Sequence, residues 1–305
     1  MAFQSASGYG NLPNGNFSPV IYSKKTIKFL RQISIVDEVT NTEFEGEIGN
    51  PGDTVRIIKQ PIVTVSAYAR GQVLATQDIE DDDITMIIDK ANYYKFSIND
   101  IEKKHSHVAF EDMAAESAAY KLKDAFDTEV LTTMLAGATA ITGAGTDAAP
   151  VAVSYTAGAD FTPVNILARI ARSLDEANVP DDGGRFVIAK PAFFEQLYQE
   201  DAKLIDVAVT GDRESILRSR KLGTSRPVHG LNLYKTNNAP VGASSGSASL
   251  LAGHVMATAT AKNILSAEML RNRDTFADDY RGLMVYGRKV VRPEALVAAY
   301  ISLPA

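Results

Sequence analysis

The sequence predicts an α+β fold, and three features of its 305 residues support that class. Residues 53–100 form a long β-type excursion, rich in Val, Ile, Thr and aromatic side chains. Residues 108–135 place an apolar side chain at every fourth position, which predicts one long helix. The remainder of the chain alternates short helices with short strands, and it contains no internal repeat.

The N-terminal segment is predicted to be a flexible arm, because residues 1–20 are rich in Gly, Asn, Ser and Pro. Three cations then fall on one helical face, at Lys24, Lys28 and Arg31, and no acidic residue occurs before Asp37. Two interpretations stay open at this point. The segment is either a short solvated helix or a basic arm that meets a neighbour, a scaffold or DNA.

The β excursion follows a turn signal at residues 50–53. Residues 54–66 predict a strand that Pro61 bends or confines to an edge, and residues 84–98 predict the returning strand. Arms of this length give a ribbon of roughly 45 Å, with the turnaround at 68–83. Because an isolated ribbon is only marginally stable and exposes its edges, we expect it to lie on another copy of the chain.

The predicted long helix runs from Val108 to Leu135 and spans roughly 42 Å. Its apolar stripe consists of residues four apart: Phe110, Ala114, Ala118, Leu122, Phe126, Val130 and Met134. Such a helix is far longer than the average of about 11 residues. We therefore expect this helix to support other elements along its length.

The following region predicts a smaller α/β unit. Thr162 is a candidate helix cap with Pro163 at the first helical position, and the apolar stripe of this helix runs from Ile166 to Leu174. Pro191 begins another helix, whose inward side chains are Phe193, Phe194, Leu197 and Tyr198. Strands are predicted at 185–189, 231–234 and 249–261, and two more lie within 283–303.

Composition excludes several classes of protein. The chain has no cysteine, so disulfides, thiolate metal sites and cysteine nucleophiles are absent. A net charge of -6 is unlike that of a dedicated nucleic-acid binder, which is usually strongly basic. No apolar run is long enough to span a bilayer, and the polar N-terminus does not resemble a secretory signal, so we expect no membrane partner.

The search for catalytic chemistry finds no convincing motif. Gly242–Gly246 matches G-x-S-x-G, but it lacks the strand and helix that a nucleophile elbow requires. His105 and His107 have no third ligand nearby in the sequence and make a weak metal signal. We therefore expect no cofactor, no metal site and no enzyme activity.

Two charged segments remain as candidate contact surfaces. The acidic run Glu80–Asp83 is interpreted as a solvated turn, as a partner for a basic patch on a neighbour, or as a cation site. The basic segment 213–226 is interpreted as a loop that meets acidic groups of a neighbour or binds phosphate. The candidate contacts between subunits are Arg70, Asp78, Glu80, Asp81, Asp82, Asp83, Arg213, Arg218, Arg220 and Lys221.

The order of these elements resembles a known family across essentially the whole chain. Three short sequence segments strengthen the resemblance: Tyr22–Thr26, Gly52–Ile57 and Tyr286–Glu294. The chain resembles the major capsid proteins of tailed bacteriophages, which have the Hong Kong 97-type fold. The resemblance implies a coat protein that self-assembles into an icosahedral shell around double-stranded DNA, located in the virion and assembled in the host cytoplasm.

The resemblance also implies a division of the chain and a set of partners. Hexamers and pentamers of the chain would build the shell, with portal and scaffolding proteins as further partners. The implied parts are an N-terminal arm at 1–45, an extended β loop with flanking strands at 46–105, a peripheral domain with a spine helix at 106–160, an axial domain at 161–262, and returning strands of the peripheral domain at 263–305.

Two alternative functions stay open from the sequence. An encapsulin-type compartment would use the same fold but needs a pocket for cargo-peptide tails, which the sequence does not identify. An α/β enzyme of unrecognised type would need a catalytic constellation, which the motif search does not find.

Overall fold

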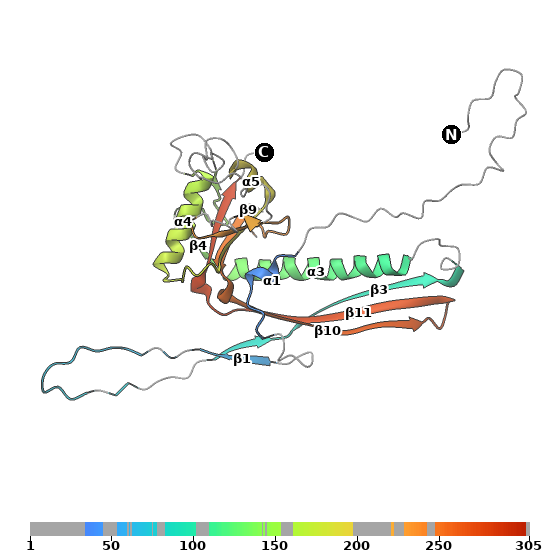
Figure 1. The fold of residues 1–305 in the computed structure, drawn as a ribbon, viewed down its shortest axis with the longest axis horizontal. Coiled ribbons are helices and arrows are strands. Elements are labelled where there is room, and N and C mark those ends of the chain that lie inside the picture. Colours follow the sequence, from blue (N-terminus) through green and yellow to red (C-terminus); the bar gives the residue numbers. More distant parts are fainter. Residues whose placement is uncertain are drawn as a thin grey trace, which may run out of the picture.

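A long helix lies along a three-stranded sheet in the middle of the molecule, and a larger mixed sheet with two further helices forms one end (Figure 1). A third, two-stranded sheet forms the base of a loop that projects away from this body (Figure 1). The computed structural model describes residues 34–44, 54–59, 61, 63–74, 76–77, 83–101, 110–141, 143, 145–153, 161–197, 221–222, 229–242 and 248–302.

The three-stranded antiparallel sheet has the order β10–β11–β3. Its strands are β10 (Thr258–Arg271), β11 (Ala277–Val290) and β3 (Lys90–Asn99). The two fourteen-residue strands span roughly 46 Å each, so the sheet is about as long as the helix beside it. An irregularity between Ile264 and Ser266 interrupts the pairing of β10 with β11.

The predicted ribbon is wrong in its pairing. Only β1 (Thr54–Ile58) and β2 (Asp83–Ile87) pair with each other, over five residues each. The second half of the predicted returning strand is β3, and it pairs with β11 over ten residues. The longer ladder satisfies more backbone groups and covers one face of β3 against the body, which explains why the chain leaves the ribbon.

The predicted long helix is present as α3 (Phe110–Gly137), and residues 108–109 lie outside the described residues. Among the described side chains of its apolar stripe, the fully buried ones lie in the C-terminal half, at Phe126, Val130 and Met134. Ala118 and Leu122 of the same stripe remain half-buried. The helix therefore packs tightly on the body along half of its length.

The seven-stranded sheet has the order β4–β12–β9–β6–β8–β7, with β5 also paired to β12. Its central strands are buried throughout or almost so, as their uninterrupted apolar sequences indicate. Its strands are β4 (Thr139–Ala140), β5 (Val151–Ala152), β6 (Arg185–Ala189), β7 (Lys221–Leu222), β8 (Asn232–Lys235), β9 (Ala248–His254) and β12 (Leu296–Ser302).

The helices beside this sheet agree with the sequence prediction. Helix α4 (Pro163–Glu176) begins at Thr162, whose hydroxyl accepts a hydrogen bond from the Asn165 backbone, and its predicted stripe is buried. Helix α5 (Pro191–Leu197) buries Phe193, Phe194 and Leu197, while Tyr198 lies outside the described residues. Two short 3₁₀ helices, η3 (Val255–Ala257) and η4 (Pro293–Ala295), connect strands.

The C-terminal segment is divided between two sheets. Most of β10 and all of β11 belong to the three-stranded sheet, but β12 pairs with β9 inside the seven-stranded sheet. Residues of β12 are almost all buried there. Burial of this apolar strand between β9 and the short strands β4 and β5 explains why the chain ends in the seven-stranded sheet.

One hydrophobic core joins the seven-stranded sheet to the C-terminal half of α3 and to β11. It includes Phe126 and Met134 of α3, Tyr286 of β11 and the buried strands of the seven-stranded sheet. The short helix α1 (Val36–Val39) adds Val36 and Val39 to the same core. Because the core is continuous, the helix, the two sheets and the start of the described chain are held in one arrangement.

The N-cap of α4 supplies a test of this architecture. Replacing Thr162 by Ala removes the acceptor for a backbone N–H, so we expect the free energy of unfolding to fall by about 1 kcal/mol. Thr162→Ser keeps the hydroxyl and is the matched control, with an expected change close to zero. Urea unfolding of the unassembled subunit measures both, and equal loss in the two variants would contradict the capping role.

Candidate assembly surfaces

The base of the projecting loop is anchored to the three-stranded sheet by a small apolar cluster. Val55 of β1 and Met86 of β2 are buried, and they pack with Ile88 and with Val285 of β11. At Gly287 a Cβ atom would lie only 2.9 Å from the carbonyl oxygen of Ile87, so the absence of a side chain lets the ribbon cross β11 closely. The direction in which the loop leaves the body is thereby fixed.

The far end of the loop is a tight turn at residues 69–72. The backbone N–H of Gln72 donates to the carbonyl of Ala69 at 3.0 Å, and Gly71 has a φ of 89°. Such a positive φ at the third residue is typical of a type II turn and favours glycine. Between the arms, the Thr64 backbone N–H donates to the side chain of Gln77 at 2.8 Å. The predicted turnaround is therefore located, and Arg70 lies at its tip.

The loop exposes apolar side chains that the described part of its own chain does not cover. All residues from 63 to 74 are exposed, and the apolar ones form what we name the loop tip. Its members, with their exposed fractions, are Val63 (64%), Val65 (93%), Tyr68 (66%), Val73 (90%) and Leu74 (77%). An apolar set of this size on a projecting segment marks a contact surface.

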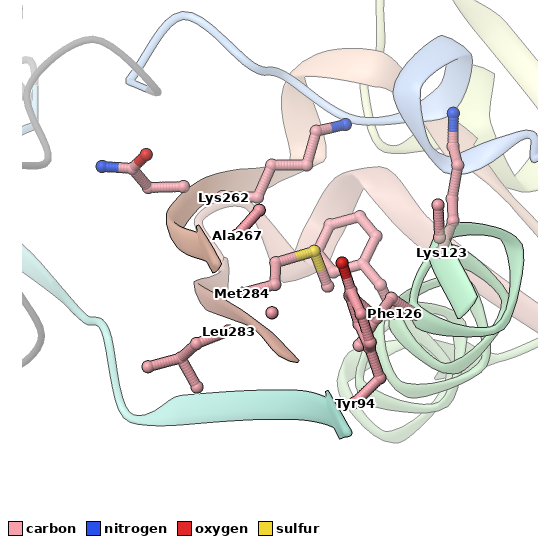
Figure 2. A pocket seen from close by; sticks show the side chains of 11 residues that line it. Tyr94, Lys123, Phe126, Lys262, Ala267, Leu283 and Met284 are labelled. Atoms are coloured by element: carbon pink, nitrogen blue, oxygen red, sulfur yellow. The ribbon is translucent and has the colours of Figure 1, made fainter. Parts of the chain in front are cut away.

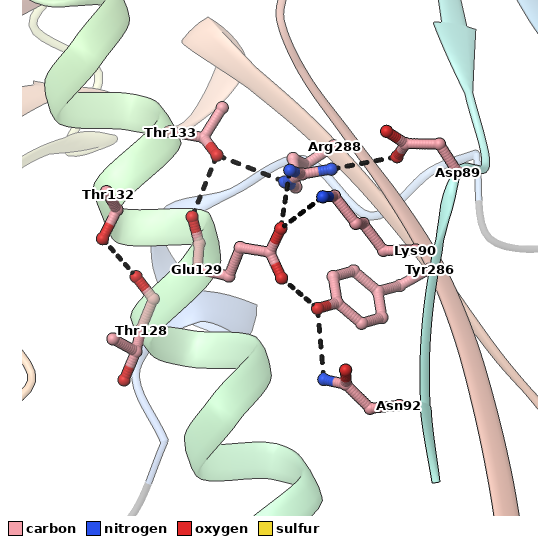
Figure 3. Close-up of polar contacts among 9 residues, drawn as sticks. All are labelled: Asp89, Lys90, Asn92, Thr128, Glu129, Thr132, Thr133, Tyr286 and Arg288. Atoms are coloured by element: carbon pink, nitrogen blue, oxygen red, sulfur yellow. Dashed lines mark hydrogen bonds and ion pairs between the residues drawn. The ribbon is translucent and has the colours of Figure 1, made fainter.

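A polar network joins α3 to the three-stranded sheet (Figure 3). The carboxylate of Glu129 accepts a hydrogen bond from the Tyr286 hydroxyl and pairs with Arg288 at 2.6 Å and Lys90 at 3.6 Å. Arg288 is also bound by Asp89 at 3.0 Å. Burial, together with the adjacent Glu129 carboxylate, raises the pKa of Tyr286 to about 12. The network fixes the helix along the sheet axis.

A second polar cluster connects the start of the described chain to α3 and β10. Asp37 binds Lys123 at 3.1 Å and Lys262 at 2.5 Å. Partial burial alone would raise the pKa of Asp37, but the two lysines outweigh burial and hold that pKa below its ordinary value. Asp127 accepts a hydrogen bond from Ser34 at 2.6 Å, and burial raises its pKa despite that bond.

A groove lies between α3 and the three-stranded sheet, next to this second cluster (Figure 2). Its volume is about 550 Å³, within the range of roughly 300–1,000 Å³ usual for binding pockets. Leu122, Phe126, Leu283 and Met284 supply most of its apolar lining, with Tyr94 at one side. Lys123 and Lys262 stand at its rim (Figure 2). We name this feature the helix–sheet groove.

The predicted contact residues are not brought together by the described part of the structure. Arg70 is at the end of the loop, and Asp83 is in β2, where it pairs with Arg56 of its own chain at 3.5 Å. Lys221 is in β7, in the seven-stranded sheet. The other predicted residues lie outside the described residues: Lys24, Lys28, Arg31, Asp78, Glu80, Asp81, Asp82, Arg213, Arg218 and Arg220.

Sequence reasoning missed the residues that form the two polar clusters. Charged residues of a long helix are usually solvated, but only 4% of Asp127 is exposed. Glu129 gave no signal because a lone acidic residue in a long helix is usually solvated. Its partner Arg288 lies in the segment Tyr286–Glu294, which carries part of the family resemblance. Only the fold reveals that the two side chains meet.

The described residues show neither a membrane-spanning helix nor a metal-binding cluster. None of the helices found there is long and apolar enough to cross a bilayer. In the same part of the chain, no group of three or more His, Asp or Glu side chains is arranged to hold a metal ion.

Comparison with known families decides which protein class carries these surfaces. A family model described as phage capsid protein matches residues 83–299, which is more than half of the chain. The chain belongs to the phage capsid protein family. This capsid protein has no match among curated proteins.

Solved structures support the same assignment. A structure from Mycobacterium phage Che8 is 25% identical, with a TM-score of 0.76, and covers 93% of this chain and 97% of its own. The capsid structure of cyanophage P-SCSP1u is 17% identical, with a TM-score of 0.74, and covers 99% of this chain and 100% of its own. The mature capsid of bacteriophage PhiM1 has a TM-score of 0.70 at 16% identity, with coverage of 99% and 97%.

These matches confirm the α+β class and the Hong Kong 97-type fold predicted from the sequence. The protein is a major capsid protein, a structural protein that forms the shell of the virion as a homo-oligomer. The family match favours the phage shell over the encapsulin-type compartment and the unrecognised enzyme.

The Glu129 network gives a test of how α3 is held. Glu129→Ala leaves Arg288, whose side chain is only 14% exposed, without its charged partner on the helix, where only the Thr133 hydroxyl still accepts from it at 3.2 Å. We expect a loss of about 2 kcal/mol in the free energy of unfolding. The matched control is Glu268→Ala, which breaks the exposed pair with Arg281 and is expected to cost less than about 1 kcal/mol. Urea unfolding of unassembled subunits compares them, and equal costs would count against the network.

Asp127 gives a pH-dependent test. Because its pKa is raised in the folded state, the folded protein holds the proton more tightly than the unfolded chain does. The free energy of unfolding therefore falls as pH rises from 3.8 through the raised pKa. Asp127→Asn removes this loss while keeping an acceptor for Ser34. We expect the variant to gain stability over the parent as pH increases, measured by urea midpoints, whereas parallel profiles would contradict the burial effect.

Proposed function

We propose that this capsid protein assembles through its projecting loop, which overlies an adjacent subunit within hexamers and pentamers of an icosahedral shell. The observation that carries the proposal is the exposed loop tip, with five large apolar side chains between Val63 and Leu74. Because the loop base is anchored by Val55 and Met86, the loop is presented to a neighbour at a fixed angle. An exposed apolar loop is an aggregation liability in an isolated molecule, but it is a contact surface in a shell.

The energetics suit a large closed assembly. Burying one Val, Leu or comparable side chain contributes about 1.5–3 kcal/mol, and the five loop-tip residues are all exposed in the single chain. Much of this gain is offset by the cost of ordering and association. The contact between any two copies is therefore modest, but closed symmetry repeats it over the whole shell.

We further propose two structural domains for the subunit. The peripheral domain consists of α3 with the three-stranded sheet, and the axial domain consists of the seven-stranded sheet with α4 and α5. The sheet memberships support this division, including β12 on the axial side. In this proposal the basic segment 213–226 belongs to axial loops that meet at the centres of hexamers and pentamers.

The proposed contents and partners follow from charge and family. The shell encloses double-stranded DNA without sequence-specific binding, and the net charge of -6 is compatible with an interior that does not trap the DNA during packaging. We propose that a scaffolding protein and a portal protein act in assembly, which occurs in the host cytoplasm. The basic residues Lys24, Lys28 and Arg31 contact a neighbouring subunit, the scaffold or DNA.

Replacement of the loop tip tests the proposal. Substituting residues 65–76 by Gly-Gly joins the arms near the hydrogen bond between Thr64 and Gln77 and removes most of the exposed apolar set. We expect a soluble subunit with the unfolding midpoint of the parent protein but no shells. Size-exclusion chromatography and negative-stain microscopy measure assembly. The control Ser66→Ala, an exposed polar position in the loop, should form shells, and intact shells from the Gly-Gly variant would refute the role of the loop.

A further inference from the structure

We infer that Arg288 is a positioning residue for the projecting loop. Helix α3 holds its guanidinium, and the guanidinium in turn binds Asp89 at the root of the loop, which sets the angle at which the loop leaves the body. This clamp is a property of the single subunit. Its effect on shells rests on the proposed function, because the angle matters to assembly only where the loop contacts a neighbour.

The root of the loop is the two-residue junction Ile88–Asp89, which lies between β2 and β3. The ladder between β3 and β11 ends at the pair formed by Lys90 and Tyr286. Beyond this pair the described chain no longer pairs with β11, and it crosses that strand at Gly287 instead. The side chains of the junction therefore decide the direction in which the loop continues.

The junction is held from two sides. Ile88 is buried and packs in the apolar cluster with Val55 and Met86 under the base of the loop. The carboxylate of Asp89 instead reaches Arg288, whose side chain is bound to α3 (Figure 3). Apolar packing on one side and an ion pair on the other restrict rotation of the loop about the junction.

The guanidinium of Arg288 has a fixed direction because α3 binds the rest of it. Its Nε donates to the Thr133 hydroxyl at 3.2 Å, and one terminal nitrogen pairs with Glu129 at 2.6 Å. The group is planar and rigid, so its other terminal nitrogen points to one place, where the Asp89 carboxylate lies 3.0 Å away. The Arg288 side chain is largely buried, which leaves the guanidinium little room to reorient.

The strength of this clamp suits positioning better than overall stability. The Asp89 side chain is 54% exposed, so its pair with Arg288 is partly screened and adds little to the free energy of unfolding. Loss of such a pair changes the ratio between two loop directions by roughly two- to fivefold. A closed shell repeats one loop angle in every copy, so this spread of angles produces irregular shells.

Distances between spin labels test the clamp, because the chain has no native cysteine. Ser66→Cys and Ala136→Cys place the labels at exposed positions in the loop and near the end of α3. Asp89→Asn removes the charge of this side chain and keeps its size. The matched control, Glu268→Gln, breaks the similarly exposed pair between β10 and Arg281. Double electron–electron resonance on unassembled subunits then measures the distribution of loop directions.

We expect Asp89→Asn to raise the population of displaced distances roughly two- to fivefold at low salt, while Glu268→Gln keeps the distribution of the labelled parent. In about 1 M NaCl the parent should approach Asp89→Asn, because salt screens the half-exposed pair. Equal distributions in Asp89→Asn and the control overturn the inference. A lower urea midpoint with an unchanged distribution also overturns it, because the pair would then only stabilise the fold.

Shells from the same substitutions, without labels, separate the clamp from the role of the loop. Under negative stain we expect Asp89→Asn to give shells of mixed size, open sheets or no closed shells, and Glu268→Gln to give shells like those of the parent. A broadened distance distribution with uniform shells overturns the assembly part of the inference. The proposed function is judged separately by the Gly-Gly loop variant, whose shells would refute it, whereas uniform shells from Asp89→Asn leave it standing.

Discussion

The packing of the C-terminal half of α3 on strand β11 is the contact on which the rest of the structure depends. The rings of Phe126 and Tyr286 meet edge to face, with centroids 5.1 Å apart, and Glu129 binds both Tyr286 and Arg288 one helical turn away. The apolar contact sets how closely α3 approaches the sheet. The charged hydrogen bonds set the position of α3 along strand β11. Half of the helix is thereby fixed, and the other half stands beside the sheet as the wall of a groove.

Strand β11 lies against both the base of the loop and the helix–sheet groove. Val285 and Gly287 lie under the base of the loop, while Gly282 and Met284 line the groove. These positions are neighbours along one strand that is paired on both edges, so the angle between loop and groove is rigid. A rigid loop base lets every copy present its loop in the same direction, which a ring of defined size requires.

The two glycines of β11 have different physical roles in this arrangement. Gly287 lets the backbone of the ribbon approach to a distance that a side chain would prevent, and Gly282 makes room for the Tyr94 ring. Neither has the positive φ that usually explains a glycine, so close approach is the reason for each. The seven-stranded sheet is joined to this region by the common core, and its buried strands give the subunit most of its apolar interior.

The sequence by itself determined the local structure and the class of protein. Periodicity located α3 to within two residues, capping chemistry located the start of α4, and the order of elements indicated the capsid fold. Those features depend on neighbours in the chain or on the succession of elements, which a sequence displays. Only the tertiary structure decided that β3 pairs with β11, that Asp127 is buried and that Glu129 meets Arg288. Each of these depends on a partner far away in the chain, and residue spacing carries no information about which distant side chains come together.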